Sequence, residues 1–385
     1  APVLRFKGFT NDWEQRKFEN LVSRLSKTSN NESLPNVTYD DIKSKENSLN
    51  KDITELTHGK KGIHFNKDDI LVGKLRPYLG NILLARFNGI AVGDFWVLSP
   101  KDNNISSFLF DLIQTSKYKY ISNLSSGSKM PRSDWNLVSK ASFWVPIQQE
   151  QNKIGKIFQL IDNLVSLQQR KLKLLRTLKS GLSFKLFNKK HLNNLSQISL
   201  DQIGRTYSGL TGKSKKDFGH GHAFYVSYLN VNQNEIGNPK QIDRIEIDKK
   251  QNLVQKNDIF FTISSETPEE VGLTSLWPVS CKNLYLNSFC FGFRINTKMF
   301  IPLYLGYLFR SEYFREKVLP LAQGISRYNL SKNNVLKIKI GQEEIAIQEK
   351  YAKVMNDLDS DILRQKKKVK ELKLCKKFLL QNMFI

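Results

Sequence analysis

Few residues of this sequence have the types and spacing that covalent chemistry requires. The segment YSGLTGKS (207–214) resembles a phosphate-binding loop, but that loop needs a glycine where the sequence has Tyr207. His220 and His222 flank a glycine, yet no CxxC or HExxH spacing of the kind that zinc ligands use is present. DKK at 248–250 matches only half of a nuclease site, and GxSxG, Cys/His and Asn-Pro-Pro-aromatic motifs are absent. We therefore expect a chain without catalytic or metal-binding residues.

Basic loops offer a different chemistry, which is contact with DNA phosphates and base edges. GLTGKSKK (209–216) is either a basic loop that approaches DNA or a solvated hairpin. SSGSKMPRSDW (125–135) and AQGISRYNLS (322–331) each contain an arginine, which suits bidentate contact with guanine, and each is either a DNA-contacting loop or a structural turn. KLRPY (74–78) adds a further basic group. The residues predicted to contact DNA are Lys74, Arg76, Tyr78, Lys129, Arg132, Lys213, Lys215, Lys216, Arg327 and Tyr328.

Two long helices are the elements that must position these loops. QNKIGKIFQLID (151–162) recurs as QEKYAKVMNDLD (348–359), with the glutamine, two lysines and the final aspartate kept. Between 148 and 187 there is no proline, and apolar residues recur three and four positions apart. The pattern predicts long helices over 147–188 and 342–385, each about 60 Å long at 1.5 Å per residue.

Each helix carries an apolar heptad stripe that needs a partner, and the other copy is the obvious one. We favour antiparallel over parallel pairing, because it places one globular domain at each end. Gln168 and Gln365 interrupt the two stripes at corresponding positions; they either meet at the centre and fix the register, or face solvent. The predicted helix-pairing residues are Ile154, Ile157, Ile161, Leu164, Gln168, Leu175, Leu178, Leu182, Val354, Leu358, Gln365, Leu372 and Leu379.

The segments outside the helices predict strands followed by a helix in both halves of the chain, so the repeat covers nearly its whole length. The expected fold class is α+β (mixed α/β): two globular domains, 1–146 and 189–341, separated by two long helices that form an antiparallel coiled coil, with a pseudo-two-fold internal repeat. The halves agree mainly in the helices. They diverge in the globular parts, where TISSE (262–266) replaces KLRPY, as expected of two copies that share a scaffold and read different sequences.

The charge of the chain indicates a polyanionic partner. Its 385 residues carry a net charge of +24, and its pI is about 9.7. Nucleic acid is the first candidate and a membrane surface the second. The sequence contains no run of 18 apolar residues, which is the length that a helix needs to span a bilayer. The start, APVLRFKGFTNDW, has no apolar signal segment and no initial methionine, so we expect that residues were removed upstream. Three cysteines are too few for a disulfide framework and favour a reducing cytoplasm.

Two globular units, each followed by a long helix of one repeated pattern, resemble the DNA specificity subunit of type I restriction-modification systems. The resemblance spans almost the whole chain, and four segments carry it. They are PVLRFKGFTNDWEQRKF at the start, KDDILVGKLRPYLGN at 67–81, the helical segment at 145–187, and its echo at the C-terminus.

The resemblance implies that each globular unit is a target-recognition domain that reads one half of a split DNA site. The helices would set the gap between the halves and dock two methyltransferase (modification) subunits, which carry S-adenosylmethionine and flip the target adenine. Restriction (translocase) subunits would add an ATP-dependent nuclease. No cofactor is expected on this chain itself; S-adenosylmethionine, ATP and Mg belong to the partner subunits, and double-stranded DNA is the direct partner. The competing interpretations are a DNA-modifying enzyme and a basic coiled-coil scaffold without sequence preference.

Overall fold

Two compact units make up the chain in the computed structural model, which describes residues 2–44, 46–124 and 130–385. The first unit contains residues 1–170 and 366–385, and the second contains residues 171–365. The long helices α5 (Gln148–Leu186) and α12 (Ile345–Asn382) each contribute residues to both units. The mixed α and β composition and the two long helices confirm the expected fold class.

The described part of the first unit is built on two four-stranded sheets. One is antiparallel with the order β2-β11-β8-β9, and the other has the order β3-β7-β10-β4 with β10 and β4 parallel. The two-stranded pairs β1-β12 and β5-β6 complete the unit. The strands are β1 Glu14–Lys17, β2 Val22–Leu25, β3 Thr28–Ser29, β4 Asn36–Val37, β5 Ile42–Lys43, β6 Ser48–Leu49, β7 Gly62–Phe65, β8 Ile70–Gly73, β9 Ile82–Leu84, β10 Gly89–Ala91, β11 Phe95–Pro100 and β12 Ser142–Val145.

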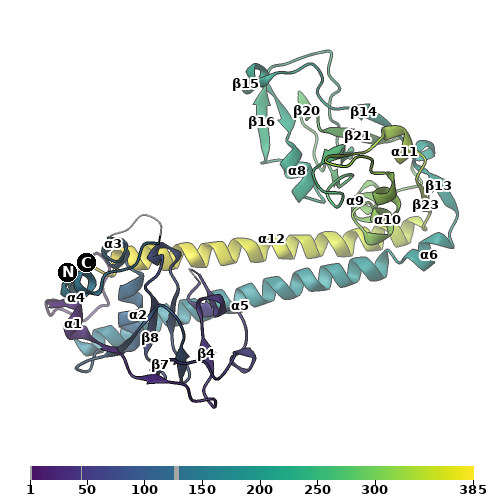
Figure 1. The fold of residues 1–385 in the computed structure, drawn as a ribbon. Coiled ribbons are helices and arrows are strands. Elements are labelled where there is room, and N and C mark those ends of the chain that lie inside the picture. Colours follow the sequence, from purple (N-terminus) through teal and green to yellow (C-terminus); the bar gives the residue numbers. More distant parts are fainter. Residues whose placement is uncertain (1, 45, 125–129) are drawn as a thin grey trace. The chain divides into compact units, whose positions relative to one another are not determined.

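The antiparallel sheet of the first unit lies between the second sheet and a layer of helices (Figure 1). Side chains alternate along a strand, so Ile70 and Val72 of β8 pack among helical residues, whereas Leu71 packs with the second sheet. On the helical side, the ring of Phe384 lies 5.4 Å from that of Phe108. The helices are α1 Phe18–Leu21, α2 Ser106–Gln114, α3 Ser116–Asn123 and α4 Trp135–Lys140.

The second unit has the same plan with longer connections. Its antiparallel sheet has the order β14-β21-β17-β19, and its other sheet has the order β16-β15-β20 with β15 and β20 parallel. The strands are β13 Gln197–Ser199, β14 Gly204–Ser208, β15 Phe218–Val226, β16 Ile242–Ile245, β17 Ile259–Thr262, β18 Ser264–Ser265, β19 Thr274–Leu276, β20 Leu284–Leu286, β21 Cys290–Ile295, β22 Tyr328–Asn329 and β23 Lys339–Gly341. The helices are α6 Lys189–Asn193, α7 Leu200–Ile203, α8 Tyr228–Gln233, α9 Pro302–Leu308, α10 Glu312–Val318 and α11 Lys332–Leu336.

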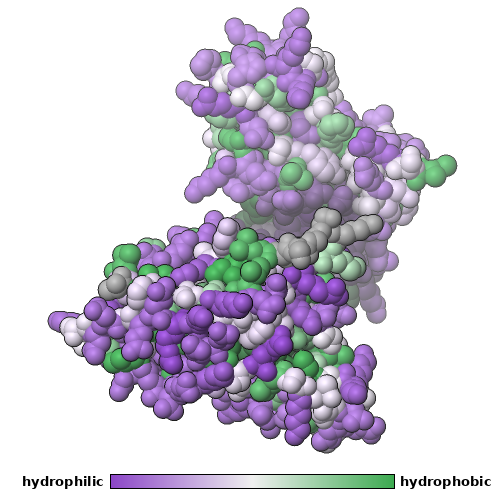
Figure 2. Space-filling view, turned by 60° about the vertical axis from the view of Figure 1, so that its left-hand side comes forward, coloured by the Kyte–Doolittle hydropathy of each residue, from purple (hydrophilic) through white to green (hydrophobic). Residues whose placement is uncertain are grey.

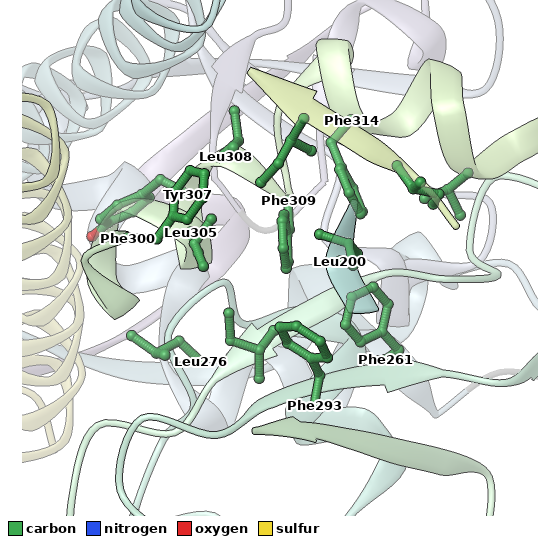
Figure 3. Close-up of a cluster of buried hydrophobic side chains, with 14 of the residues drawn as sticks. Leu200, Phe261, Leu276, Phe293, Phe300, Leu305, Tyr307, Leu308, Phe309 and Phe314 are labelled. Carbon is green, nitrogen blue, oxygen red and sulfur yellow. The ribbon is translucent and has the colours of Figure 1, made fainter. Parts of the chain in front are cut away.

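Aromatic side chains fill the core of the second unit between its antiparallel sheet and helices α9 and α10. Figure 3 shows the strand residues Phe261 and Phe293 facing Phe309 and Phe314 on the helical side. The rings of Phe309 and Phe314 stack with centroids 4.3 Å apart, and Phe261 lies 5.7 Å from Phe309. Burial of this much apolar area is the main stabilising term of such a unit.

Buried glutamines attach each long helix to its own unit in the same way. Gln151 of α5 accepts a hydrogen bond from the Ile105 N–H at 3.0 Å and donates to the Pro146 carbonyl at 3.0 Å. Gln348 of α12 accepts from the Ile301 N–H at 2.8 Å and donates to the Glu343 carbonyl at 2.8 Å. The repeat detected in the sequence is therefore also a repeat of topology and of specific hydrogen bonds.

Within each unit, the start of one long helix contacts the end of the other. In the first unit, Asp162 of α5 accepts from Lys376 of α12 at 2.6 Å. In the second unit, Lys179 of α5 donates to Asp359 of α12 at 2.6 Å. Both aspartates end the repeated twelve-residue segment, and Lys376 lies 197 positions after Lys179, like the aspartates. The helix segments are therefore antiparallel in each unit, and the same ion pair holds them with the roles of α5 and α12 exchanged.

Three of the predicted pairing residues are more exposed than the residue that follows each of them. Leu164 and Leu178 of α5 are 37% and 50% exposed, and Val354 of α12 is 36% exposed. The less exposed positions are the residues that follow, Val165 and Lys179 on α5 and Met355 on α12. Of the other predicted pairing residues, Ile154 and Ile161 are buried, and Ile157, Leu175, Leu182, Leu358, Leu372 and Leu379 are partly buried.

At one of these places, the less exposed position is occupied by a charged side chain, Lys179. A pattern of apolar residues assigns Leu178 to the inside, but the carboxylates of Asp359 and Glu235 hold the ammonium of Lys179 there. Gln168 belongs to the first unit and Gln365 to the second. Their meeting at the centre of the helix pair stays a prediction.

Candidate nucleic-acid interface

Two loops that the sequence analysis treated separately converge in the first unit. Leu75 in the segment after β8 pairs with Arg132 in an antiparallel bridge. The N–H of Arg76 donates to the Pro131 carbonyl at 2.7 Å, and the N–H of Ser133 donates to the Lys74 carbonyl at 2.8 Å. The predicted residues Lys74, Arg76 and Arg132 therefore lie at one site. Lys129 lies outside the described residues.

An aspartate stands at the centre of this site. Asp94, which immediately precedes β11, faces Lys74 through Oδ1 at 3.4 Å. Its Oδ2 accepts hydrogen bonds from Nε and Nη2 of Arg132 at 3.2 and 3.0 Å. Partial burial opposes ionisation of Asp94, but the hydrogen bond from Arg132 and the charge of Lys74 outweigh it and lower its pKa. We call Lys74, Asp94 and Arg132 the charged trio; its net charge is +1.

The backbone around the charged trio is fixed by a partly buried tyrosine, Tyr39. The Tyr39 hydroxyl donates to the Asp94 carbonyl at 2.6 Å and accepts from the Leu75 N–H at 3.2 Å. The same carbonyl accepts from the Lys74 N–H at 2.9 Å. The Tyr39 ring packs edge-on against Phe95 at 4.6 Å, which anchors the site to the core. The charged side chains thus stand on a framework that is formed without DNA.

Two further predicted residues flank the charged trio. Arg76 has a φ of 49°, a left-handed conformation that costs a non-glycine residue about 1 kcal/mol and is often found at functional sites. Tyr78, on the short helix η3 (Pro77–Leu79), is 56% exposed. Both side chains therefore remain accessible beside the trio.

The second unit has the same backbone frame at the corresponding place. The N–H of Ile263 donates to the Phe289 carbonyl at 2.9 Å, and the N–H of Leu330 donates to the Ile263 carbonyl at 2.9 Å. Strands β18 and β22 pair here, as the bridge between Leu75 and Arg132 does in the first unit. These two hydrogen bonds correspond to two in the first unit. There the Lys74 N–H donates to the Asp94 carbonyl, and the Ser133 N–H donates to the Lys74 carbonyl.

The side chains on this shared frame differ between the units. Ile263, Phe289 and Asn329 take the places of Lys74, Asp94 and Arg132, so the second unit has no charged trio at this place. The Phe289 side chain is 54% exposed, and the predicted residue Arg327 lies over its ring at 6.0 Å. The predicted Tyr328 is partly buried in β22. The backbone hydrogen bonds of this frame are the same in both units, whereas the side chains that it presents differ.

The basic loop 209–216 forms part of a separate polar cluster. Lys213 pairs with Asp248 at 2.8 Å, and its side chain is only 14% exposed. The hydrogen bond from Lys213 is the largest of the interactions that lower the pKa of Asp248 to about 2. Lys215 and Lys216, on η4 (Lys215–Asp217), are exposed. Lys213 therefore helps to hold the loop, whereas Lys215 and Lys216 remain open to a partner.

Sequence reasoning missed Asp94 and Tyr39. A search for DNA contacts selects cations and passes over an acid, and Tyr39 lies far from the basic loops in the sequence. The only signal was position: Asp94 and Phe289 immediately precede the corresponding strands β11 and β21. Among the described residues, no group of three or more His, Cys, Asp or Glu side chains could hold a metal ion.

Hydrophilic side chains predominate on the face seen in Figure 2. Within the described parts of the chain, no helix combines the length and apolar character needed to cross a membrane. A hydrophilic surface on a chain with a net charge of +24 suits a polyanion such as DNA.

Comparisons with known proteins found one matching family model and several similar structures. The family model of the type I restriction modification DNA specificity domain matches residues 11–177. The structure of a type I restriction-modification system S subunit from M. genitalium is similar over 100% of this chain and 99% of its own, with a TM-score of 0.65 and 16% identity. A structure from work on complex assembly and conformational transition of the type I R-M system matches over 96% and 97%, with a TM-score of 0.54 and 13% identity. At such identities the structural matches establish the fold.

Proposed function

We infer that each globular unit of this chain, whose residues 11–177 match the model of the type I restriction modification DNA specificity domain, reads one half of a bipartite DNA site. The chain is a DNA sequence-recognition subunit and not an enzyme in its own right. We assign the two reading domains to residues 1–146 and 189–341. The competing interpretations, a modifying enzyme and a scaffold without sequence preference, find no support.

One observation carries this proposal: a common backbone frame presents different side chains in the two units. Phosphate contacts position a protein on DNA, whereas base contacts at the groove edges specify the sequence. A reader of two unlike half-sites needs one scaffold with two sets of exposed side chains. The change from Lys74, Asp94 and Arg132 to Ile263, Phe289 and Asn329 fits that requirement.

Charge supplies the affinity that such reading needs. The net charge of +24 favours release of counterions from the DNA backbone, so binding should weaken steeply as salt rises. The exposed Lys215 and Lys216 are suited to phosphate contact in the second unit. Arg76, Tyr78, Arg327 and Tyr328 are placed beside the two frames, where base edges or phosphates could be reached.

The long helices supply spacing and assembly in this proposal. Helices α5 and α12 would set the gap between the half-sites and dock two methyltransferase subunits that carry S-adenosylmethionine. Restriction subunits that use ATP and Mg would join the same complex, in the cytoplasm. The family likeness implies these partner subunits, and they would catalyse all the reactions of the complex.

Mapping of modified adenines tests the proposal. The chain is expressed with its methyltransferase subunits in cells that lack other adenine methylation, and the modified sites are aligned. We expect two short specific sequences separated by a gap of fixed length, and no modification when this chain is omitted. A contiguous motif, or modification by the purified chain alone, would refute the proposed function.

A further inference from the structure

We propose that Arg132 reads a guanine in the half-site of the first unit, and that Asp94 is the positioning residue that aims it. This inference rests on the proposed function, which makes the first unit a reader of DNA. It assigns one base identity and two residue roles within that function.

The hydrogen bonds of Arg132 leave the outer edge of its guanidinium available. Asp94 Oδ2 accepts from Nε and Nη2, which form the inner edge of the planar group. Within the described residues, Nη1 has no hydrogen-bond partner, and the Arg132 side chain is 56% exposed. Two of the five N–H donors are therefore used, and the outer pair on Nη1 and Nη2 can reach a ligand.

Guanine is the base that this outer edge fits. Its major-groove edge presents N7 and O6, two acceptors side by side, which match two parallel N–H donors. Adenine places the donor N6–H₂ beside N7, and the pyrimidines do not present two adjacent acceptors. An arginine whose inner edge is already occupied therefore discriminates by the geometry of its outer edge.

Asp94 holds the Arg132 guanidinium in this orientation before DNA binds. A free arginine samples many rotamers, and holding one of them on binding costs entropy. Asp94 is itself fixed, because its carbonyl accepts hydrogen bonds from the Tyr39 hydroxyl at 2.6 Å and the Lys74 N–H at 2.9 Å. Lys74 faces the other carboxylate oxygen at 3.4 Å, so the trio keeps a net positive charge toward DNA.

The half-site of the second unit should lack this requirement for guanine. Phe289 stands where Asp94 would, and Asn329 stands where Arg132 would, on the same backbone frame. No aspartate positions an arginine there in the described residues. The guanine required by the charged trio is therefore expected in only one of the two half-sites.

The test uses the assembled enzyme, that is, this chain with its methyltransferase subunits, and DNA sites that differ at one base pair at a time. Arg132→Lys keeps the charge but loses the planar fork, and Asp94→Asn keeps the shape but loses the charge. We expect Arg132→Lys to reduce the preference for one G·C pair by at least about tenfold. Asp94→Asn should reduce it in part and Asp94→Glu should restore some of it, while the second half-site keeps its full preference.

Arg86→Lys is the matched control, because Arg86 is 54% exposed and forms a similar surface pair with Asp68 at 3.6 Å. It should leave the motif unchanged. Equal weakening on all sequences by Arg132→Lys would make Arg132 a phosphate contact and overturn the inference, as would a first half-site without a required G·C pair. An unchanged preference in Asp94→Asn would remove the role of Asp94. If the unaltered enzyme showed no two-part motif, the proposed function itself would fail instead.

Discussion

Asp94 and Gln151 illustrate two kinds of residue in a duplicated protein. Gln151 and its counterpart Gln348 make the same hydrogen bonds in both units, and both side chains are buried. Asp94 is replaced by Phe289 at the same point of a conserved frame. Residues that hold the frame are thus kept in both copies, and residues that face outward are free to specialise.

The pH dependence of stability offers a test of the charged trio. The pKa of Asp94 in the folded chain lies below its usual value of 3.8. A lowered folded-state pKa means that the ionised group stabilises the fold fully above pH 3.8, and that this contribution is lost as the pH falls through the folded value. Asp94→Asn should therefore be less stable than the unaltered chain at pH 6–7, and the difference should shrink below about pH 4. Denaturant unfolding over this pH range measures it; a difference that grows on acidification contradicts the ion-pair account.

Removal of a buried glutamine tests the frame. Gln151→Met deletes the side-chain donor and acceptor and leaves the Ile105 N–H and Pro146 carbonyl without these partners. We expect the unfolding free energy of the first unit to fall by about 1–3 kcal/mol. Gln149→Met, at a neighbouring exposed position, should be nearly neutral. Equal effects of the two substitutions in chemical denaturation would show that the hydrogen bonds of Gln151 do not matter.

At the residue scale, the sequence predicted which loops are basic, but not that two of these loops lie together. Lys74, Arg76 and Arg132 were selected by residue type. Their convergence depends on the pairing of Leu75 with Arg132, across more than fifty residues, which local patterns do not encode. Asp94 was missed because an acid has no place in a search for DNA-binding cations.

At the scale of elements, one ion pair joins the two long helices within each unit. Lys179 and Lys376 are counterparts in the repeat, and each pairs with the aspartate that ends the repeated segment on the other helix. Apolar periodicity predicted the helices well, since long heptad patterns are strong signals. It favoured Leu178 as an inner residue, although Lys179 is the less exposed of the two, because the stem of a long charged residue can also occupy an inner position.

Lys179→Met tests this network in the second unit. Lys179 donates to Glu235 and Asp359, and the Tyr307 hydroxyl donates to Asp359 at 2.9 Å. Burial, together with the charge of Asp359, raises the pKa of Tyr307, so the phenol stays a neutral donor. The substitution leaves two carboxylates without their cation and should lower the unfolding free energy by about 1–3 kcal/mol. The exposed Lys173→Met is the control, and equal losses in both variants would refute the network.

At the scale of the whole molecule, the two long helices link the two globular units along one chain. Of the α5 residues, 148–170 belong to the first unit and 171–186 to the second, and α12 passes between the units in the opposite order. The sequence indicated this organisation through its repeat and helix lengths. The helix length is then the quantity that we expect to set the gap in the DNA site.

Matched helix deletions test the spacing. Removing one heptad from the middle of α5 and one from the middle of α12 keeps the apolar pattern in phase and shortens each helix by about 10 Å. We expect the gap between half-sites to narrow by about three base pairs at 3.4 Å each, with both half-site sequences unchanged. Modification mapping gives the gap directly. An unchanged gap, with activity retained, contradicts the idea that the helices set it.

The most direct measurement of the central claim is the modification motif of two variants, one in each unit. Arg132→Lys and Arg327→Lys are mapped beside the unaltered chain in the same assembled enzyme. The account predicts that the first variant loosens only one half of the motif, that the second loosens only the other, and that the gap stays fixed. If both variants altered the same half, or if either altered both, the two units would not be independent readers on a shared frame.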